Sequence, residues 1–244
     1  MDSTSLLILQ QKLLKEYEEV LFQEETLWFQ KSREKWVRLG SRNTSFFHTQ
    51  TVIRWKRNKI HGITLPSGEW CTDNDTLKLE ALRYFKNLFC TKEQLIPSPT
   101  SRSQFALDNE QKHILMSTVT KQEVYQALMN MKSYKAPGPD GFQPIFYKMF
   151  WKDIGDDVLK FVKTAFEIGS IDPQVAESLM ILLPKVDNPT SFKEFLPISL
   201  CNVTCKLVSK VLVNRLRPML IDIVSPLQSS FIPGRGTVDN AIVL

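Results

Sequence analysis

The alternation of apolar and polar residues predicts a chain dominated by helices. The first predicted helix covers residues 5–38, where Leu6, Leu9 and Leu13 recur at helical spacing and no Gly or Pro interrupts before Gly40. The same periodicity, with Thr120 and Glu123 forming a capping box, predicts further helices at 74–89, from 120 onward, at 144–150, at 153–168 and at 201–220. Gly169 is expected to end the helix at 153–168.

Strands are predicted at only two places. Residues 58–72 alternate apolar and polar positions on both sides of a Pro-Ser-Gly turn, which indicates a β-hairpin. The apolar run 178–183 predicts a buried strand. Residues 135–142 form a turn-rich loop, and 97–105 are typical of a linker. The predicted fold class is therefore α+β and helix-rich.

The triplet Gly155-Asp156-Asp157 looks like a polymerase metal site, but its flanks indicate otherwise. Such a site needs a strand-turn-strand hairpin, with apolar flanks on a period of two. Here the apolar flanks keep helical spacing from Ile154 to Phe166. We therefore expect the two acids in the first turn of a helix, where carboxylates suit the positive helix end.

Positive charge is concentrated in one short segment. The chain carries a net charge of +5, but residues 31–60 alone contain nine Lys or Arg and one acid. Trp36, Phe46, Phe47 and Trp55 are interleaved with these cations. Cations neutralise phosphates and aromatic faces stack on unpaired bases, so the segment predicts contact with nucleic acid. A solvated charged face is the plainer interpretation, weakened here by the scarcity of acids.

Composition excludes several other classes of protein. A hydrophobic fraction of 43% and a charged fraction of 23% are those of an ordinary globular chain. No apolar run is long enough for a signal-peptide core or a membrane span, so we expect an intracellular protein, nuclear or cytoplasmic, with no membrane partner. Of the four cysteines only Cys201 and Cys205 are close in sequence, and no His lies near them. Buried thiols are therefore favoured over a metal site.

Several blocks, taken together and in order, resemble a known family. KAPGPDG (135–141), LPK (183–185), PISLCNV (197–203), SKVLVNRL (209–216) and SPLQSSFIPGR (225–235) resemble early blocks of the reverse transcriptase of non-LTR (LINE-type) retrotransposons. WVRLGSRNTSFFH (36–48), the hairpin and YFKNLF (84–89) resemble the region upstream of that domain in plant members. The resemblance covers roughly residues 20–244.

The resemblance implies a fold and a set of site residues. It implies the fingers of a right-hand polymerase, preceded by a helical arm and a hairpin, with an incomplete palm. It divides the chain into an upstream region (1–96), a linker (97–119) and a partial reverse transcriptase domain (120–244). By the resemblance, Lys185 faces the phosphates of a nucleotide and Arg235 contacts the template. The cations and indole expected along the nucleic-acid path are Arg33, Lys35, Arg38, Arg42, Arg54, Trp55, Lys56, Arg57 and Lys59.

Two departures from the family pattern argue against catalysis by this chain. The chain ends at Leu244, before the blocks whose aspartates hold Mg²⁺ in the family, so we expect no catalytic residue, metal or cofactor in it, although a complete polymerase would need Mg²⁺. Leu196 stands where the family has an arginine that reaches the triphosphate, and leucine cannot make that forked contact.

Three interpretations remain open from the sequence. The first is a catalytically silent fragment of an RNA-directed DNA polymerase, a nucleotidyltransferase, that binds RNA or an RNA–DNA hybrid, with a DNA target as a further option. The second is a non-enzymatic nucleic-acid-binding or interaction module, in which residues 5–38 form a helix for a protein partner. The third is a non-functional relic.

Overall fold

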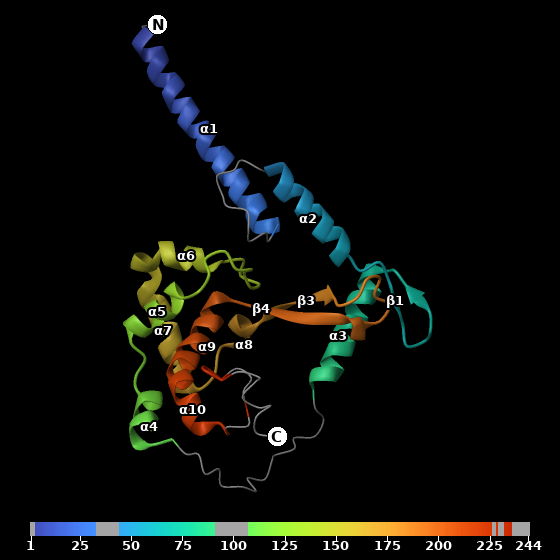
Figure 1. Ribbon diagram of the computed structural model, residues 1–244, viewed down its shortest axis with the longest axis vertical. Coiled ribbons are helices and arrows are strands. Elements are labelled where there is room, and N and C mark those ends of the chain that lie inside the picture. Colours follow the sequence, from blue (N-terminus) through green and yellow to red (C-terminus); the bar gives the residue numbers. More distant parts are fainter. Residues whose placement is uncertain (1–2, 33–43, 91–106, 226–227, 229–231, 236–244) are drawn as a thin grey trace. The chain divides into compact units, whose positions relative to one another are not determined.

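A computed structural model of the chain describes residues 3–32, 44–90, 107–225, 228 and 232–235. In these ranges the elements are mainly helices, with two small sheets (Figure 1). The chain divides into two compact units: unit 1 holds residues 1–91 and 182–197, and unit 2 holds residues 92–181 and 198–244. We expected a boundary near residue 96 and a continuous region from 120 onward. The structure instead assigns the later segment 182–197 to unit 1.

Unit 1 begins with two helices that pack against each other. Helix α1 (Ser3–Ser32) matches the start of the predicted helix at 5–38, whose remainder lies outside the described residues. Helix α2 (Thr44–Asn58) was not predicted from the sequence as a helix. The fully buried ring of Phe47 lies edge-on to Phe29 of α1, with 5.5 Å between centroids, and holds α2 in place.

The predicted hairpin and the helix after it form the second part of unit 1. Strands β1 (Ile63–Thr64) and β2 (Trp70–Cys71) pair antiparallel, as predicted, with Ile63 opposite Cys71. Helix α3 (Asn74–Phe89) has the predicted bounds and is capped by Asp73, which accepts from the Thr76 amide. The core that joins them combines both sequence segments of unit 1 and consists of Ile63, Leu77, Phe85, Phe192 and Phe195.

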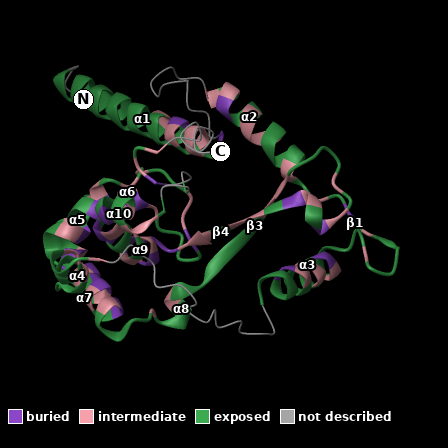
Figure 2. Cartoon of the chain, turned by 60° about the horizontal axis from the view of Figure 1, so that its bottom comes forward, coloured by how far each residue is buried: buried purple, intermediate pink, exposed green. Residues whose placement is uncertain are grey.

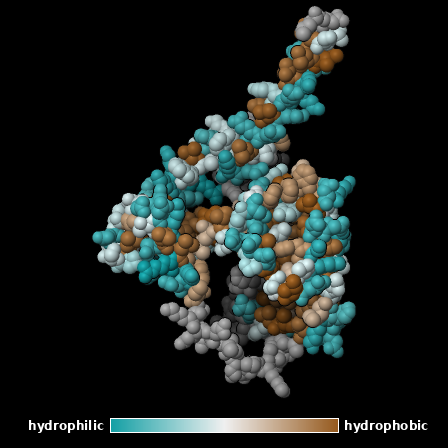
Figure 3. All heavy atoms as spheres, turned by 180° about the vertical axis from the view of Figure 1, so that it is seen from behind, coloured by the Kyte–Doolittle hydropathy of each residue, from teal (hydrophilic) through white to brown (hydrophobic). Residues whose placement is uncertain are grey.

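The first half of α1 carries exposed apolar side chains. Leu6, Leu9 and Leu13 are 50%, 48% and 55% exposed, and Figure 2 colours this half of the helix almost entirely as exposed. Figure 3 shows apolar side chains along the same helix. The protein partner expected for residues 5–38 remains a prediction. Across the described ranges, each helix is too short or too polar to cross a bilayer.

The run 178–183 is a strand, but it is not buried. In the part of the chain that the structure describes, strand β3 (Ser178–Pro184) pairs with β4 (Phe195–Cys201) and with no other strand, and the sequence did not predict β4. Leu179, Met180 and Ile181 are 50%, 41% and 41% exposed. The prediction of burial was wrong because it assumed a wider, covered sheet, whereas a two-stranded sheet leaves apolar side chains in contact with solvent.

Unit 2 is a helical bundle. Three helices provide most of its core: α5 (Lys121–Met129), α7 (Trp151–Ile168) and α9 (Val203–Leu216), with Leu128, Val162 and Leu207 fully buried. Gly169 ends α7 in a left-handed conformation, as predicted. Around this core lie α4 (Asn109–Met116), α6 (Pro144–Met149), α8 (Pro173–Ala176), the 3₁₀ turn η2 (Arg217–Met219) and α10 (Leu220–Ile223). Helix α4 falls in the segment 97–119 that we expected to be a linker.

A buried arginine joins three parts of unit 2. Arg215, near the end of α9, donates from Nε and Nη2 to the two carboxylate oxygens of Glu123, at 2.8 and 3.0 Å. Its guanidinium also donates to the carbonyl of Leu115, in the last turn of α4, and to those of Ser117 and Thr118, between α4 and α5. Glu123 belongs to the predicted capping box with Thr120, which the structure confirms.

This ion pair makes the stability of unit 2 sensitive to acid. The hydrogen bond from Arg215 outweighs partial burial and lowers the pKa of Glu123 below its ordinary value of 4.5. Because the folded-state pKa is lower, the stabilisation is fully present above pH 4.5 and is lost as the pH falls through the folded pKa. We expect the urea midpoint to fall in this range. The Glu123→Gln variant should be less stable than the unchanged protein at neutral pH, and its urea midpoint should fall less on acidification. An equal fall of the midpoint in the two proteins would contradict this assignment.

The loop 135–142 is held against the start of α9. The Asp140 amide donates to Oδ1 of Asn202 at 3.2 Å, and Nδ2 of Asn202 donates to the Val175 carbonyl at 3.0 Å. Burial, with the nearby Asp140 carboxylate, raises the pKa of Tyr147 to about 12, so its phenol stays protonated. Lys206 of α9 also donates from Nζ to the Ala136 carbonyl at 3.3 Å, so the loop is held by the buried amide of Asn202 and by this lysine.

Candidate nucleic-acid interface

The exposed end of α2 carries the basic residues that the sequence singled out. Arg54, Trp55, Lys56 and Arg57 occupy consecutive exposed positions, and Lys59 follows directly after the helix. Trp55 is 64% exposed, with the Lys59 ammonium 5.9 Å from its ring centroid. Lys56 and Arg57 also lie in the last helical turn, where cations stabilise the helix dipole. In that position the ammonium of Lys56 and the guanidinium of Arg57 are still exposed and can meet phosphates.

The turn between β3 and β4 lies beside this basic end within unit 1. Arg57 is 4.0 Å from the Asp187 carboxylate in that turn, and both side chains are more than two-thirds exposed. Such an exposed pair contributes little to stability, so it shows proximity more than fixed geometry. On the other side, the Thr64 amide donates to the Thr190 carbonyl at 2.8 Å, which ties the hairpin to the same turn.

Lys185 begins this turn. Its amide donates to the Glu194 carbonyl at 2.8 Å, and its Nζ donates to the Lys193 carbonyl at 3.2 Å on the protein surface. The residue predicted to meet nucleotide phosphates is thus two positions from Asp187, the partner of Arg57. The structure brings the α2 cations and the turn that carries Lys185 together in unit 1. No local sequence pattern predicted this proximity.

Other predicted site residues lie elsewhere. Arg33, Lys35, Arg38 and Arg42 fall outside the described residues. Arg235 belongs to unit 2, where its guanidinium donates to four backbone carbonyls, those of Ile221, Val224, Ser225 and Gln228. This arginine closes the C-terminal end of α10, a structural role. Its contact with a template remains a prediction.

Sequence reasoning missed one exposed indole. Trp70 of β2 is 53% exposed, and its ring lies against the backbone of Gly62: a Cβ at Gly62 would be 2.5 Å from two ring carbons. Unit 1 therefore presents a second aromatic side chain, on the hairpin that is tied to the β3–β4 turn. The alternation that predicted the hairpin could have suggested an outward side chain at this position, but gave no reason to single it out.

The acidic and thiol side chains considered for a metal in the sequence are dispersed in the described residues. These residues contain no group of three or more His, Cys, Asp or Glu side chains that could hold a metal ion. The Gly155-Asp156-Asp157 triplet lies in α7, as a helical element and not a hairpin, and Asp156 pairs with Lys121 at 2.6 Å. The prediction that the two acids lie in the first turn was wrong, because α7 begins at Trp151 and the acid in its first turn is Asp153. Cys205 is buried and donates to the Val175 carbonyl, while burial raises the pKa of its thiol.

Comparison with known proteins places the chain among relatives from transposable elements. It is 27% identical over 206 residues to the "transposon TX1 uncharacterized 149 kDa protein" of Xenopus laevis, covering 83% of this chain and 16% of that protein. It is 25% identical over 150 residues to the "retrovirus-related Pol polyprotein from type-2 retrotransposable element R2DM" of Drosophila melanogaster, covering 61% of this chain and 13% of that protein. No protein-family model matches the chain.

These relatives support the coarser part of the family resemblance. The chain is a distant homologue of non-LTR retrotransposon proteins, and it spans less than a fifth of the length of either relative. At this low identity the relatives do not test whether the chain contains a reverse transcriptase domain or comes from a plant-type element. Both remain predictions.

Proposed function

We propose that the chain is the nucleic-acid-binding part of a LINE-type retroelement polyprotein, from the first portion of its RNA-directed DNA polymerase. It binds RNA or an RNA–DNA hybrid through the α2 surface, defined as Arg54, Trp55, Lys56, Arg57 and Lys59. The observation that carries the proposal is the gathering of four cations and an exposed indole on one helix end, beside the turn with Lys185. The relatives from transposable elements support it independently.

The chemistry of this surface fits a phosphate backbone. Each Lys or Arg that meets a phosphate releases a condensed counterion, so affinity falls as salt rises. Trp55 and Trp70 offer faces on which unpaired bases can stack, a contact that tolerates any sequence. The proposed binding is therefore electrostatic and largely independent of sequence.

A non-enzymatic nucleic-acid-binding or interaction module, with no remaining polymerase role, is a second candidate. Leu196, in β4, is 49% exposed and carries no charge. By the family resemblance an arginine would reach the triphosphate from this position, and leucine offers no donor for it. This substitution favours a chain that has kept a binding surface without nucleotide chemistry.

The test is a fluorescence anisotropy titration of the whole chain against a short RNA–DNA hybrid, repeated across salt concentrations. If about six of the nine cations in residues 31–60 meet phosphates, the four of the α2 surface among them, log affinity should fall with log salt with a slope of about −4 to −6. Replacing Arg54, Lys56, Arg57 and Lys59 by Ala should weaken binding and reduce the slope by about 3 to 4, because four contacts are lost.

A matched control removes the same charge elsewhere in unit 1. Lys12, Lys15, Lys78 and Arg83 are four exposed cations on α1 and α3. Their replacement by Ala should leave the salt slope nearly unchanged. An equal loss of slope in both variants would mean that net charge, and not the α2 surface, governs binding, and would contradict the proposal.

A further inference from the structure

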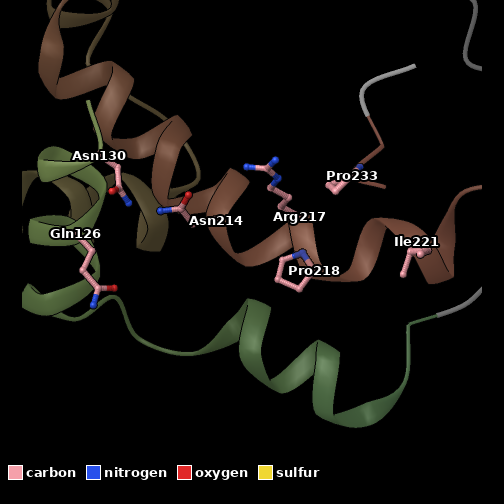
Figure 4. A pocket seen from close by; sticks show the side chains of 7 residues that line it. All are labelled: Gln126, Asn130, Asn214, Arg217, Pro218, Ile221 and Pro233. Carbon is pink, nitrogen blue, oxygen red and sulfur yellow. The ribbon is translucent and has the colours of Figure 1, made fainter. Parts of the chain in front are cut away.

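Unit 2 contains a hollow of about 510 Å³, lined by apolar surface and a few polar side chains, none of which belongs to the α2 surface (Figure 4). It lies among the ends of α5 and α9, the turn η2, helix α10 and the turn that carries Pro233. Its volume falls within the roughly 300–1,000 Å³ usual for small-ligand sites. The side chains that line it are Gln126, Asn130, Asn214, Arg217, Pro218, Ile221 and Pro233.

Four of these side chains can form hydrogen bonds and have no partner in the described part of the chain. Gln126, Asn130, Asn214 and Arg217 make no side-chain hydrogen bond or ion pair with any described residue. Figure 4 shows the amides of Asn130 and Asn214 pointing toward one another. Donors and acceptors from separate helices thus converge on one opening.

The contrast between two neighbouring arginines supports a role in binding. Arg215 is 5% exposed and fully engaged by the Glu123 carboxylate and three carbonyls. Arg217, two positions later, is exposed and lines the hollow. The contacts of Arg215 within the bundle explain why an arginine stands at that position. No such contact with a described residue engages the guanidinium of Arg217, which is available to an external anion.

We propose that this hollow binds one nucleotide of an unpaired RNA strand, and this inference rests on the proposed function. A carboxamide offers a donor and an acceptor side by side, which match the hydrogen-bonding edge of a nucleobase. A guanidinium makes forked contacts to phosphate. Pro218, Ile221 and Pro233 supply apolar surface for the base or ribose. Two amides and one arginine therefore select a base and hold its phosphate.

The test compares short single-stranded homopolymers of A, C and U by fluorescence anisotropy with the whole chain. Because each good base contact contributes about 1–3 kcal/mol, we expect the three affinities to differ by about tenfold or more. The double variant Asn130→Ala/Asn214→Ala should reduce this spread to about threefold or less, with an unchanged salt slope. Arg217→Ala should weaken all three probes alike and reduce the slope by about 0.7, the value for one single-strand contact.

The outcomes separate this inference from the proposed function. Equal affinities for the three homopolymers, or an unchanged spread in the double variant, would overturn the nucleotide site even if the α2 surface binds as proposed. If replacing the four cations of the α2 surface leaves affinity and salt slope unchanged while the base preference persists, only the proposed function is overturned. If the double Ala variant is not helical by circular dichroism, the isosteric pair Asn130→Asp/Asn214→Asp replaces it. That pair replaces the amide donors by carboxylates, which only accept hydrogen bonds and repel phosphate, so it should weaken binding of all three homopolymers and change their order of affinity.

Discussion

Replacing Arg215 by Ala should lower the free energy of unfolding of unit 2 by about 3–5 kcal/mol. Its guanidinium is 5% exposed and satisfies both oxygens of Glu123 together with three carbonyls in the last turn of α4 and between α4 and α5. Truncation removes all these donors at once and leaves a cavity beside the Phe166 ring, whose centroid is 5.5 Å from the guanidinium carbon. Urea unfolding followed by circular dichroism measures the loss.

The neighbouring arginine gives the matched control. Arg217→Ala removes the same side chain from an exposed position and should change stability by no more than about 0.5 kcal/mol. A cost below about 1 kcal/mol for Arg215→Ala would mean that water replaces the lost donors and that Arg215 does not organise the turn. Arg215→Lys should recover only part of the loss, because an ammonium cannot make the forked contact.

Gly138→Ala should destabilise unit 2 by about 3 kcal/mol, at the upper end of the usual cost of overpacking. A Cβ at this position would lie 2.3 Å from Asn202 Oδ1, 2.4 Å from Asn202 N and 2.5 Å from Cys201 C. Two of these atoms belong to the backbone and cannot move aside without displacing the start of α9. The loop must therefore shift, and the Asp140–Asn202 hydrogen bond is lost with it. Urea unfolding measures the cost.

A second substitution tests whether backbone overlap is the cause. Asn202→Ala removes the side-chain oxygen but leaves the two backbone contacts of Gly138 in place. Gly138→Ala should therefore still be costly when introduced into the Asn202→Ala variant. If its cost there falls to near zero, the side chain of Asn202 alone explains the glycine.

Whether an element could be predicted from the sequence depends on whether the interactions that hold it are local or join distant segments. Helices α3, α5 and α7 were predicted because periodicity, capping residues and a terminal glycine all lie within one stretch of chain. Helix α2 was missed because it is held largely by Phe47 against Phe29 of α1, a contact between separate helices. Strand β3 was found, but its exposure could not be predicted, since burial depends on how many strands surround it.

The candidate site shows the same division. Charge and aromatic spacing singled out the residues of the α2 surface, and block order suggested Lys185. Their joint location in unit 1 depends on the Thr64–Thr190 hydrogen bond and on the core that Phe192 and Phe195 share with Ile63, contacts that cross more than a hundred residues of sequence. Asn130, Asn214 and Arg217 carried no signal, because isolated polar residues on helices usually face solvent.

The sequence by itself determined the helical character of the chain, its concentration of positive charge and its relation to retroelement proteins. These properties are local or additive, so they can be obtained from composition, spacing and motif order. Only the tertiary structure decided that the side chain of Arg215 is buried and that of Arg217 exposed. It also decided that the segment 182–197 belongs to unit 1, the unit that carries the α2 surface. The physical reason is that burial and proximity depend on which distant elements pack together, and no local pattern records that choice.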